Sequence, residues 1–329
     1  MEAFPAQPPS ARKAHTTTLQ AAVTTTARLH FGFLDPSGRG PRPFGSFGLS
    51  LDRPLTRLTL KRAHALKVTG PERERARHYL ESIAASCGVA PAYALDIEEA
   101  IPSHAGLGSG TQLALAVGSA FAALEGLPLS PDEIAQRLQR GTRSGIGIAT
   151  FASGGAVLDG GPRYGALPPL VSRLPFPPEW RVLLIFDPAS KGLTGESEAA
   201  AFTSLPDFPE AATEELYRRI THAALPALAQ ADFKTFCEQV GYLQACMGAY
   251  FAPLQGGPCQ SVAVSEALDR LRRQGVTGLG QSSWGPTGFA FAATEAEGGT
   301  LLAEAQAHHA GLRFELACGR NEGARIETT

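Results

Sequence analysis

The sequence predicts an α+β protein built from two domains. Its 329 residues are about twice the length of a typical domain. Candidate strands and helices follow one another without the strict alternation of a parallel α/β sheet, and this order favours α+β. A proline-rich run at residues 162–178 is the best boundary. We therefore expect a disordered tail at residues 1–20, a first domain at 21–175 and a second domain at 176–329.

The first domain is predicted to begin with a strand at residues 24–33, where polar and apolar residues alternate loosely before a glycine. Residues 34–53 are dense in Gly, Pro, Ser and Phe, which is typical of a long loop. A capping-box pattern at Ser130 opens a helix that reaches Arg140. The other elements expected here are strands at 56–68, 93–101 and 155–158, a helix at 71–87 and an Ala- and Leu-rich helix that ends near Leu124.

The second domain is predicted to open with an apolar strand at residues 181–187, whose composition is that of a buried strand. Helical patterns then dominate, and the segment closes with a strand, a helix and a strand. The expected helices are 209–229, 232–247, 261–274 and 295–309, and the expected strands are 288–293 and 312–317.

The composition argues against several classes of protein. Lys and Arg number 29 against 31 Asp and Glu, so the sequence lacks the basic surface of a nucleic-acid-binding protein. No apolar run approaches the length of a membrane span, and the first residues lack the apolar core of a secretion signal. We expect a cytoplasmic protein that binds neither nucleic acid nor membranes. The cysteines fit neither a disulfide framework nor a zinc site, and they are Cys87, Cys237, Cys246, Cys259 and Cys318.

The strongest chemical signal is a glycine-rich turn between an expected strand and an expected helix. Glycines let the backbone approach a ligand, and the first turn of a helix offers unpaired N–H groups at its positive end. Such a turn is suited to a phosphate or a diphosphate. The predicted phosphate-binding residues are Gly106, Leu107, Gly108, Ser109, Gly110 and Thr111.

Two common phosphate-binding motifs do not match this turn. The lysine of a P-loop is absent, and Thr111 stands where a dinucleotide-binding turn has its third glycine. A tight turn that only lets a helix pack closely is the alternative interpretation.

Two glycine-rich segments together resemble the GHMP kinase superfamily. The sequence Pro102-x-x-x-Gly106-Leu107-Gly108-Ser109 is similar to that superfamily's second motif, and residues 278–288 occupy the place of its third. The resemblance implies a GHMP-kinase-like two-domain fold. Its N-terminal domain would contain a left-handed βαβ crossover, its C-terminal domain would be ferredoxin-like, and the site would lie between them.

One position departs from the kinases of this superfamily. Many of them carry an Asp near the substrate hydroxyl in a Ser-Gly-Ile-Asp sequence, whereas this chain reads Ser144-Gly145-Ile146-Gly147. Glycine cannot accept a proton or orient a hydroxyl, so the kinase base is missing. Some kinases of the superfamily manage without it, so an ATP-dependent small-molecule kinase stays the alternative. A non-catalytic sensor of nucleotides or sugar phosphates is a third hypothesis.

The same segments resemble one branch of the superfamily, the β-ribofuranosylaminobenzene 5'-phosphate synthases. The resemblance rests mainly on Gln281-Ser282-Ser283-Trp284-Gly285-Pro286-Thr287 combined with Arg143-Ser144-Gly145-Ile146-Gly147. It implies a decarboxylating phosphoribosyltransferase of tetrahydromethanopterin-type cofactor biosynthesis, using phosphoribosyl pyrophosphate and 4-aminobenzoate or a close 4-substituted benzoate. Mg²⁺ is the expected cofactor, and the resemblance is compatible with a homodimer. The para substituent and the metal ligands stay open.

Several other residues are candidates for the site. Arg28 and His30 share one face of a strand, where they would contact phosphate or carboxylate, or simply meet solvent. Arg143 offers a fork-shaped donor for either anion. Trp284 is placed to stack on the aromatic acceptor or to fill the domain interface. These four are the predicted catalytic residues: Arg28, His30, Arg143 and Trp284.

The remaining substrate-binding candidates are weaker. Ser283 adjoins Trp284, and Lys191 follows a strand end, where α/β sites often gather. Asp159 would hold a metal or, more in keeping with its Gly-Gly neighbours, begin a turn. Glu196 and Glu198 are expected to be solvated at a helix start.

Overall fold

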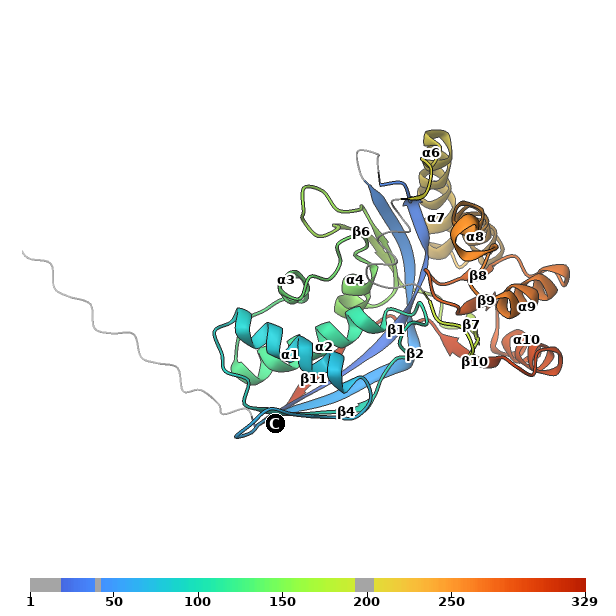
Figure 1. Cartoon of the computed structure of the whole chain (residues 1–329). Coiled ribbons are helices and arrows are strands. Elements are labelled where there is room, and N and C mark those ends of the chain that lie inside the picture. Colours follow the sequence, from blue (N-terminus) through green and yellow to red (C-terminus); the bar gives the residue numbers. More distant parts are fainter. Residues whose placement is uncertain (1–18, 39–42, 193–203) are drawn as a thin grey trace, which may run out of the picture.

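The computed structural model describes residues 19–38, 43–192 and 204–329. In the described residues two sheets organise the chain: a seven-stranded sheet with the path β11-β1-β2-β4-β3, extended by β5 and β6, and a four-stranded sheet with the order β10-β7-β9-β8 (Figure 1). The predicted α+β class is confirmed.

The larger sheet is built mainly from the first half of the chain. Its strands β1 and β2 form one long antiparallel hairpin, and β3 runs parallel to β4 with α1 between them. Helix α2 packs on β1 and β2 and against α1 (Figure 1). The elements are β1 (Gln20–Asp35), β2 (Phe44–Arg62), β3 (Lys67–Thr69), α1 (Arg73–Ser86), β4 (Tyr93–Glu99), α2 (Ser109–Glu125), α3 (Pro131–Arg137), α4 (Ile146–Ser153), β5 (Ala156–Asp159), β6 (Leu170–Leu174) and β11 (Arg325–Thr328).

The smaller sheet has the topology of a ferredoxin-like domain. Its strands are all antiparallel, and the chain passes through them as β7, helices, β8, β9, α10 and β10. Helices α9 and α10 lie beside this sheet in Figure 1. The elements are β7 (Arg181–Phe186), α6 (Glu210–Arg219), a π-helical turn η1 (Ile220–Ala224), α7 (Leu225–Ala229), α8 (Phe233–Gln255), α9 (Val262–Arg273), β8 (Leu279–Gln281), β9 (Gly288–Ala292), α10 (Glu295–His308) and β10 (Arg313–Cys318).

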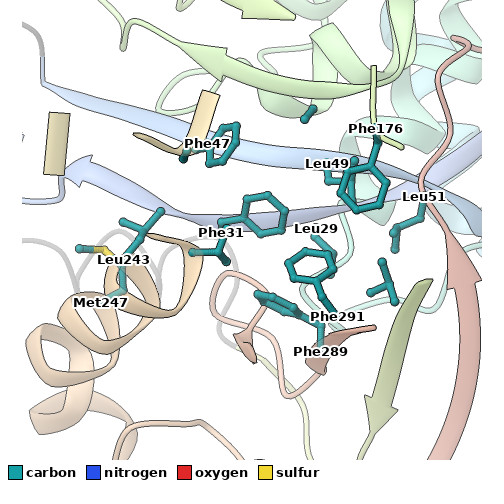
Figure 2. Close-up of a cluster of buried hydrophobic side chains, with 14 of the residues drawn as sticks. Leu29, Phe31, Phe47, Leu49, Leu51, Phe176, Leu243, Met247, Phe289 and Phe291 are labelled. Carbon is teal, nitrogen blue, oxygen red and sulfur yellow. The ribbon is translucent and has the colours of Figure 1, made fainter. Parts of the chain in front are cut away.

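The two halves meet across a core of aromatic and aliphatic side chains. Leu29 and Phe31 of β1 are fully buried and face Phe289 and Phe291 of β9, while Met247 of α8 closes one side (Figure 2). Phe31 lies 5.6 Å from Phe289 and 5.8 Å from Phe291 between ring centroids. Because side chains alternate along a strand, the core takes Leu29 and Phe31 and leaves Arg28 and His30 on the opposite face.

The predicted loop at residues 34–53 is wrong, because β2 already begins at Phe44. Glycine in this segment serves close packing rather than a loop conformation. A Cβ atom on Gly48 would lie 2.5 Å from the Leu29 carbonyl oxygen and 2.7 Å from the Ile146 side chain. Strand pairing across the hairpin therefore overrides the loop-like composition.

Further elements escaped the sequence prediction or differ from it. Helix α4 is short and lies in a glycine-rich stretch, and β6, β8 and β11 are short strands. Gln20, predicted to belong to the tail, is the first residue of β1, and residues 1–18 lie outside the described residues. Strand β11 pairs with β1 in the larger sheet, although its residues were assigned to the second domain. The boundary near residue 175 stays a prediction.

No helix among the described residues is long and apolar enough to cross a bilayer.

Candidate active site

The glycine-rich turn ends in the N-terminus of α2, as the sequence indicated. Gly108 precedes the helix in a left-handed conformation with φ of 81°, and no side chain caps the first turn. The first turn also contains no acidic residue, so no carboxylate neutralises the positive end of the helix. The backbone N–H groups at the start of α2 are therefore available to an anion.

The second glycine-rich segment is docked against this turn. Ser282 Oγ donates to the Gly106 carbonyl oxygen at 2.8 Å and accepts the His30 backbone N–H at 3.0 Å. A Cβ atom on Gly285 would overlap the Gly106 nitrogen and the Ala105 carbonyl group, so the two backbones touch where only glycine fits. Ser282 thus ties β1, the turn before α2 and the second half of the chain together.

A cavity of about 410 Å³ opens over the start of α2. Its lining contains arginines and histidines but no Asp or Glu among the described residues. Arg28 Nη1 donates to the Gly106 carbonyl oxygen at 2.6 Å, and its guanidinium packs beside Gly108. The predicted residues that line the cavity are Arg28, His30, Gly106, Gly108, Ser109, Gly110, Thr111, Arg143, Ser283 and Trp284. Leu107 is buried in the core instead.

Nine lining residues were not among the predicted site residues: Phe33, Arg75, Tyr79, His104, Arg140, Gly141, Thr142, Ser144 and Gly285. Arg75 and Tyr79 come from α1, and Arg140 follows α3. Arg140 Nη2 donates to the Tyr79 hydroxyl at 2.5 Å, and a Cβ atom on Gly110 would lie 2.8 Å from Arg75 Nη2. These cations lie beside the α2 N-terminus only through tertiary packing. The sequence offered no local signal for them apart from their charge.

His30 is the most unusual polar residue of the cavity. It is 3% exposed, and neither ring nitrogen has a hydrogen-bond partner among the described residues. Burial, with a smaller effect of the Arg28 charge, lowers the pKa of His30 from 6.5 to about 3. The imidazole is therefore neutral at physiological pH.

Asp159 is a structural residue, as the turn interpretation suggested. Its carboxylate accepts hydrogen bonds from Ser46 Oγ at 2.5 Å, from the Gly145 N–H at 2.8 Å and from the Gly161 N–H at 2.9 Å. Burial raises the pKa of Asp159, and these hydrogen bonds oppose the rise. Asp159 does not line the cavity, and it fixes the turn that carries Arg143 and Ser144. The alternative of a metal ligand finds no support.

The remaining candidates lie near the cavity in different ways. Trp284 is 3% exposed and packs on Phe251 of α8 at 4.3 Å between ring centroids, so it fills the interface while its surface reaches the cavity. The Ser283 N–H donates to the His30 carbonyl oxygen at 3.2 Å. Lys191 is exposed and absent from the lining, although its neighbour Gly192 donates to the His104 carbonyl oxygen. Glu196 and Glu198 lie outside the described residues.

Gly147, at the position of the kinase Asp, is closed off by its neighbours. A Cβ atom there would lie 3.0 Å from Thr111 Cγ2. The Gly147 carbonyl oxygen accepts a hydrogen bond from Gln112 Nε2 at 2.8 Å. No group of three or more His, Cys, Asp or Glu residues that could hold a metal occurs in the part of the chain that the structure describes.

Fold and site together define a protein with the GHMP kinase architecture. The GHMP kinases N terminal domain family matches residues 74–155, and the GHMP kinases C terminal family matches residues 224–311. A mevalonate pyrophosphate decarboxylase from Streptococcus pyogenes superposes with a TM-score of 0.68 at 14% identity, over 93% of this chain and 98% of that chain. A putative homoserine kinase from Listeria monocytogenes gives 0.64 at 18% identity, over 93% and 99%.

Sequence relatives are more specific. The Beta-ribofuranosylphenol 5'-phosphate synthase of Archaeoglobus fulgidus is 31% identical over 93% of this chain and 99% of its own length. The synthase of the same name from Methanothermobacter thermautotrophicus is 27% identical over 93% of this chain and 98% of its own. The chain belongs to this synthase family, and the resemblance inferred from its motifs is confirmed.

Proposed function

We propose that the protein transfers a 5-phosphoribosyl group from phosphoribosyl pyrophosphate to the ring of a 4-substituted benzoate, releasing pyrophosphate and CO₂. The observation that carries this proposal is the basic cavity over the α2 N-terminus, with no carboxylate among its described lining residues, in a member of this synthase family. The relatives' name describes a product with a phenol ring and a ribofuranose 5'-phosphate. It favours a para hydroxyl on the acceptor, with 4-aminobenzoate as the alternative.

The cavity suits the donor because the donor is a polyanion. The α2 N-terminus supplies backbone N–H groups, and Arg28, Arg75, Arg140 and Arg143 surround them. As the bond from ribose C1 to the diphosphate breaks, negative charge grows on the leaving group. Hydrogen-bond donors that the protein already holds in the right orientation stabilise this charge, because they do not have to rearrange during the reaction. Arg28, held by the Gly106 carbonyl oxygen, is such a donor.

The reaction also explains why a glycine is tolerated at position 147. The acceptor attacks through an electron-rich ring carbon, so no hydroxyl has to lose a proton to a base. The electron pair of the bond to the carboxylate returns to the ring when CO₂ leaves. What the protein must supply is orientation of the two substrates and charge stabilisation on the diphosphate.

Mg²⁺ belongs to this proposal as the partner of the donor diphosphate. The described lining offers several hydroxyl groups, among them those of Ser109 and Thr111 at the start of α2, but no carboxylate. A cation that prefers oxygen ligands would therefore be held mainly by the diphosphate and water, with these hydroxyls as the available protein ligands. The cation would neutralise charge on the leaving group.

The direct test combines the purified protein with phosphoribosyl pyrophosphate, Mg²⁺ and carboxyl-labelled 4-hydroxybenzoate or 4-aminobenzoate. We expect labelled CO₂ and pyrophosphate in equal amounts, and the acceptor with the higher kcat/KM identifies the para substituent. Absence of both products with both acceptors contradicts the proposal. Substrate-dependent formation of ADP from ATP would instead support the kinase alternative. Sedimentation of the same sample tests the expected homodimer.

The arginines that the sequence reasoning missed give a sharper test. We expect Arg75→Ala and Arg140→Ala each to weaken binding of phosphoribosyl pyrophosphate about tenfold, because each removes a charge-assisted contact. Arg273→Ala removes the same charge from an exposed position of α9 outside the cavity and should leave binding unchanged. Titration calorimetry measures all three variants. Equal effects in all three would show that only overall charge matters.

A further inference from the structure

The two ends of the cavity differ in chemistry. At one end Arg75 and Arg140 approach Gly110 at the start of α2. At the other end His30 and Phe33 lie in contact, with ring centroids 4.7 Å apart in an edge-to-face arrangement. A bulge in β1 after His30 turns Phe33 to the same face as His30. We name these the cationic end, which also holds Tyr79 beside Arg140, and the aromatic end, where the charge of Arg28 also acts on His30.

A small pocket of about 30 Å³ extends the aromatic end toward α8. It shares His30, Phe33, Ser283 and Trp284 with the main cavity. The α8 residues Gln244, Met247 and Phe251 line its far side. The imidazole of His30 therefore stands where the main cavity passes into this recess, whose lining mixes apolar side chains with Gln244, Gln255 and Gln281.

The unpartnered ring of His30 points to a ligand at this place. Leaving a buried polar atom without a hydrogen bond costs about 1–3 kcal/mol, and both ring nitrogens are in this state. A neutral imidazole has one donor and one acceptor. One hydroxyl or amino group can accept from the protonated ring nitrogen or donate to the other, whereas a phosphate oxygen can only accept.

On the basis of the proposed function, we infer that His30 binds the para substituent of the benzoate acceptor, with the acceptor ring against Phe33. A para substituent lies opposite the carboxylate, so the carboxylated carbon then faces the cationic end, where the donor is held. His30 is in this way a residue that orients the acceptor and selects it by its para group.

The contact strengthens during the reaction. The carboxylated ring carbon forms its bond to ribose C1, and the diphosphate leaves with the electron pair of its own bond to C1. The ring is then positively charged, and part of that charge lies on the para oxygen or nitrogen. The proton of this group becomes a better hydrogen-bond donor to His30 until CO₂ leaves and the ring regains its electrons. Interactions that strengthen in the transition state are those that raise the rate.

The test compares two acceptors that differ only in the para group. Calorimetry in the presence of pyrophosphate and Mg²⁺ measures binding of 4-hydroxybenzoate and of 4-methylbenzoate, which cannot hydrogen-bond at that position. We expect the wild type to prefer 4-hydroxybenzoate by at least about tenfold. His30→Leu should reduce this preference to about twofold, and His30→Gln should keep part of it. His64→Leu, at an exposed histidine, should keep all of it.

The expected pattern also separates the acceptor from the donor. Pyrophosphate should bind His30→Leu and His30→Gln within about threefold of the wild type. An unchanged preference in both His30 variants, or a loss of pyrophosphate affinity with the preference intact, overturns the inference. The inference is also overturned if the wild type binds the two acceptors with equal affinity, or binds neither of them. These measurements involve no turnover, so failure of the inference can be told apart from failure of the proposed function. The latter would appear as no release of CO₂ or pyrophosphate.

Discussion

The two glycine-rich segments of the site look alike in composition and serve different purposes. At residues 106–111 the chain passes from a turn into α2, and the first turn of that helix has no side-chain cap. At residues 280–288 the chain closes on itself, since Ser282 N–H donates to the Thr287 carbonyl oxygen at 2.9 Å and Gly285 N–H to the Ser282 carbonyl oxygen at 3.3 Å. Gly106 and Gly285 let the two backbones touch, whereas a Cβ atom on Gly108 or Gly110 would meet the Arg28 or Arg75 side chain of the cavity.

The largest expected effect concerns residues 280–288, the docking segment, which packs against the turn before α2. Gly285→Ala places a methyl group on the Gly106 nitrogen and the Ala105 carbonyl group, which are backbone atoms that cannot move aside alone. We expect the free energy of unfolding to fall by about 3 kcal/mol in urea titrations. Gly299→Ala is the matched control, because nothing lies within 4 Å of a Cβ atom there and α10 favours alanine. A Gly285→Ala variant that is as stable as the wild type would mean that the two backbones do not need to touch.

The second effect concerns residues 106–111, the turn that leads into α2. Ser109→Trp inserts a bulky side chain at the first residue of α2, where the wild-type side chain lines the cavity. We expect phosphoribosyl pyrophosphate to bind at least about 100-fold more weakly, equivalent to about 2.7 kcal/mol, in calorimetric titrations. The thermal midpoint without ligand should stay within a few degrees of the wild type. Donor affinity that survives this insertion would place the anion site elsewhere.

The third effect follows from the residue that the docking segment holds in place. The pKa of His30 is lowered from 6.5 to about 3 in the folded chain. Below pH 6.5 its imidazole therefore binds a proton in the unfolded chain but not in the folded chain. Stability is therefore lost as the pH falls from 6.5 toward 3, and His30 alone should account for about 2 kcal/mol between pH 7 and pH 5. Urea titrations at both values should show this loss in the wild type and in His64→Leu, and not in His30→Leu. An equal acid sensitivity in His30→Leu would contradict the burial of a neutral imidazole.

The smallest effect is expected at Gly147, where many kinases of the superfamily have an Asp. Gly147→Ala brings a methyl group to 3.0 Å from Thr111 Cγ2, which must give way, at a cost of about 1 kcal/mol in unfolding titrations. In a Thr111→Ser background that methyl group is absent and the cost should fall to less than about half. Additive effects of the two substitutions would show that Thr111 does not fill the position. Gly147→Asp should form no ADP from ATP, because the proposed phosphoribosyl transfer uses no base at this position.

Much of the site could be predicted because its signals are local. The glycine-rich turn and the helix after it are adjacent in sequence, the alternation of β1 places Arg28 and His30 together, and Ser130 forms the predicted capping box with Glu133. Other features depend on distant partners. Arg75 and Arg140 reach the cavity from separate elements. The bulge that aligns Phe33 with His30 appears only when β1 pairs with β2.

The same dependence on distant partners explains the errors in the predicted fold. Residues 44–53 form a strand because β1 and β5 flank them, not because their own composition favours one. Helix α4 is short and lies in a glycine-rich stretch, and the Asp159 carboxylate from β5 accepts the N–H of Gly145, the residue before the helix. Tertiary contacts decide the conformation of both segments, so a pattern of neighbouring residues could not reveal them.

The pairing of β11 with β1 bears on how the protein is made. Val23 lies opposite Ile326, so a strand that leaves the ribosome among the first of the described residues gains its outer neighbour among the last. Until then one edge of the larger sheet is open to other chains, which is the kind of surface that invites aggregation during synthesis. The nascent chain is therefore more exposed to aggregation at this edge than the finished fold, in which β11 covers the first part of β1.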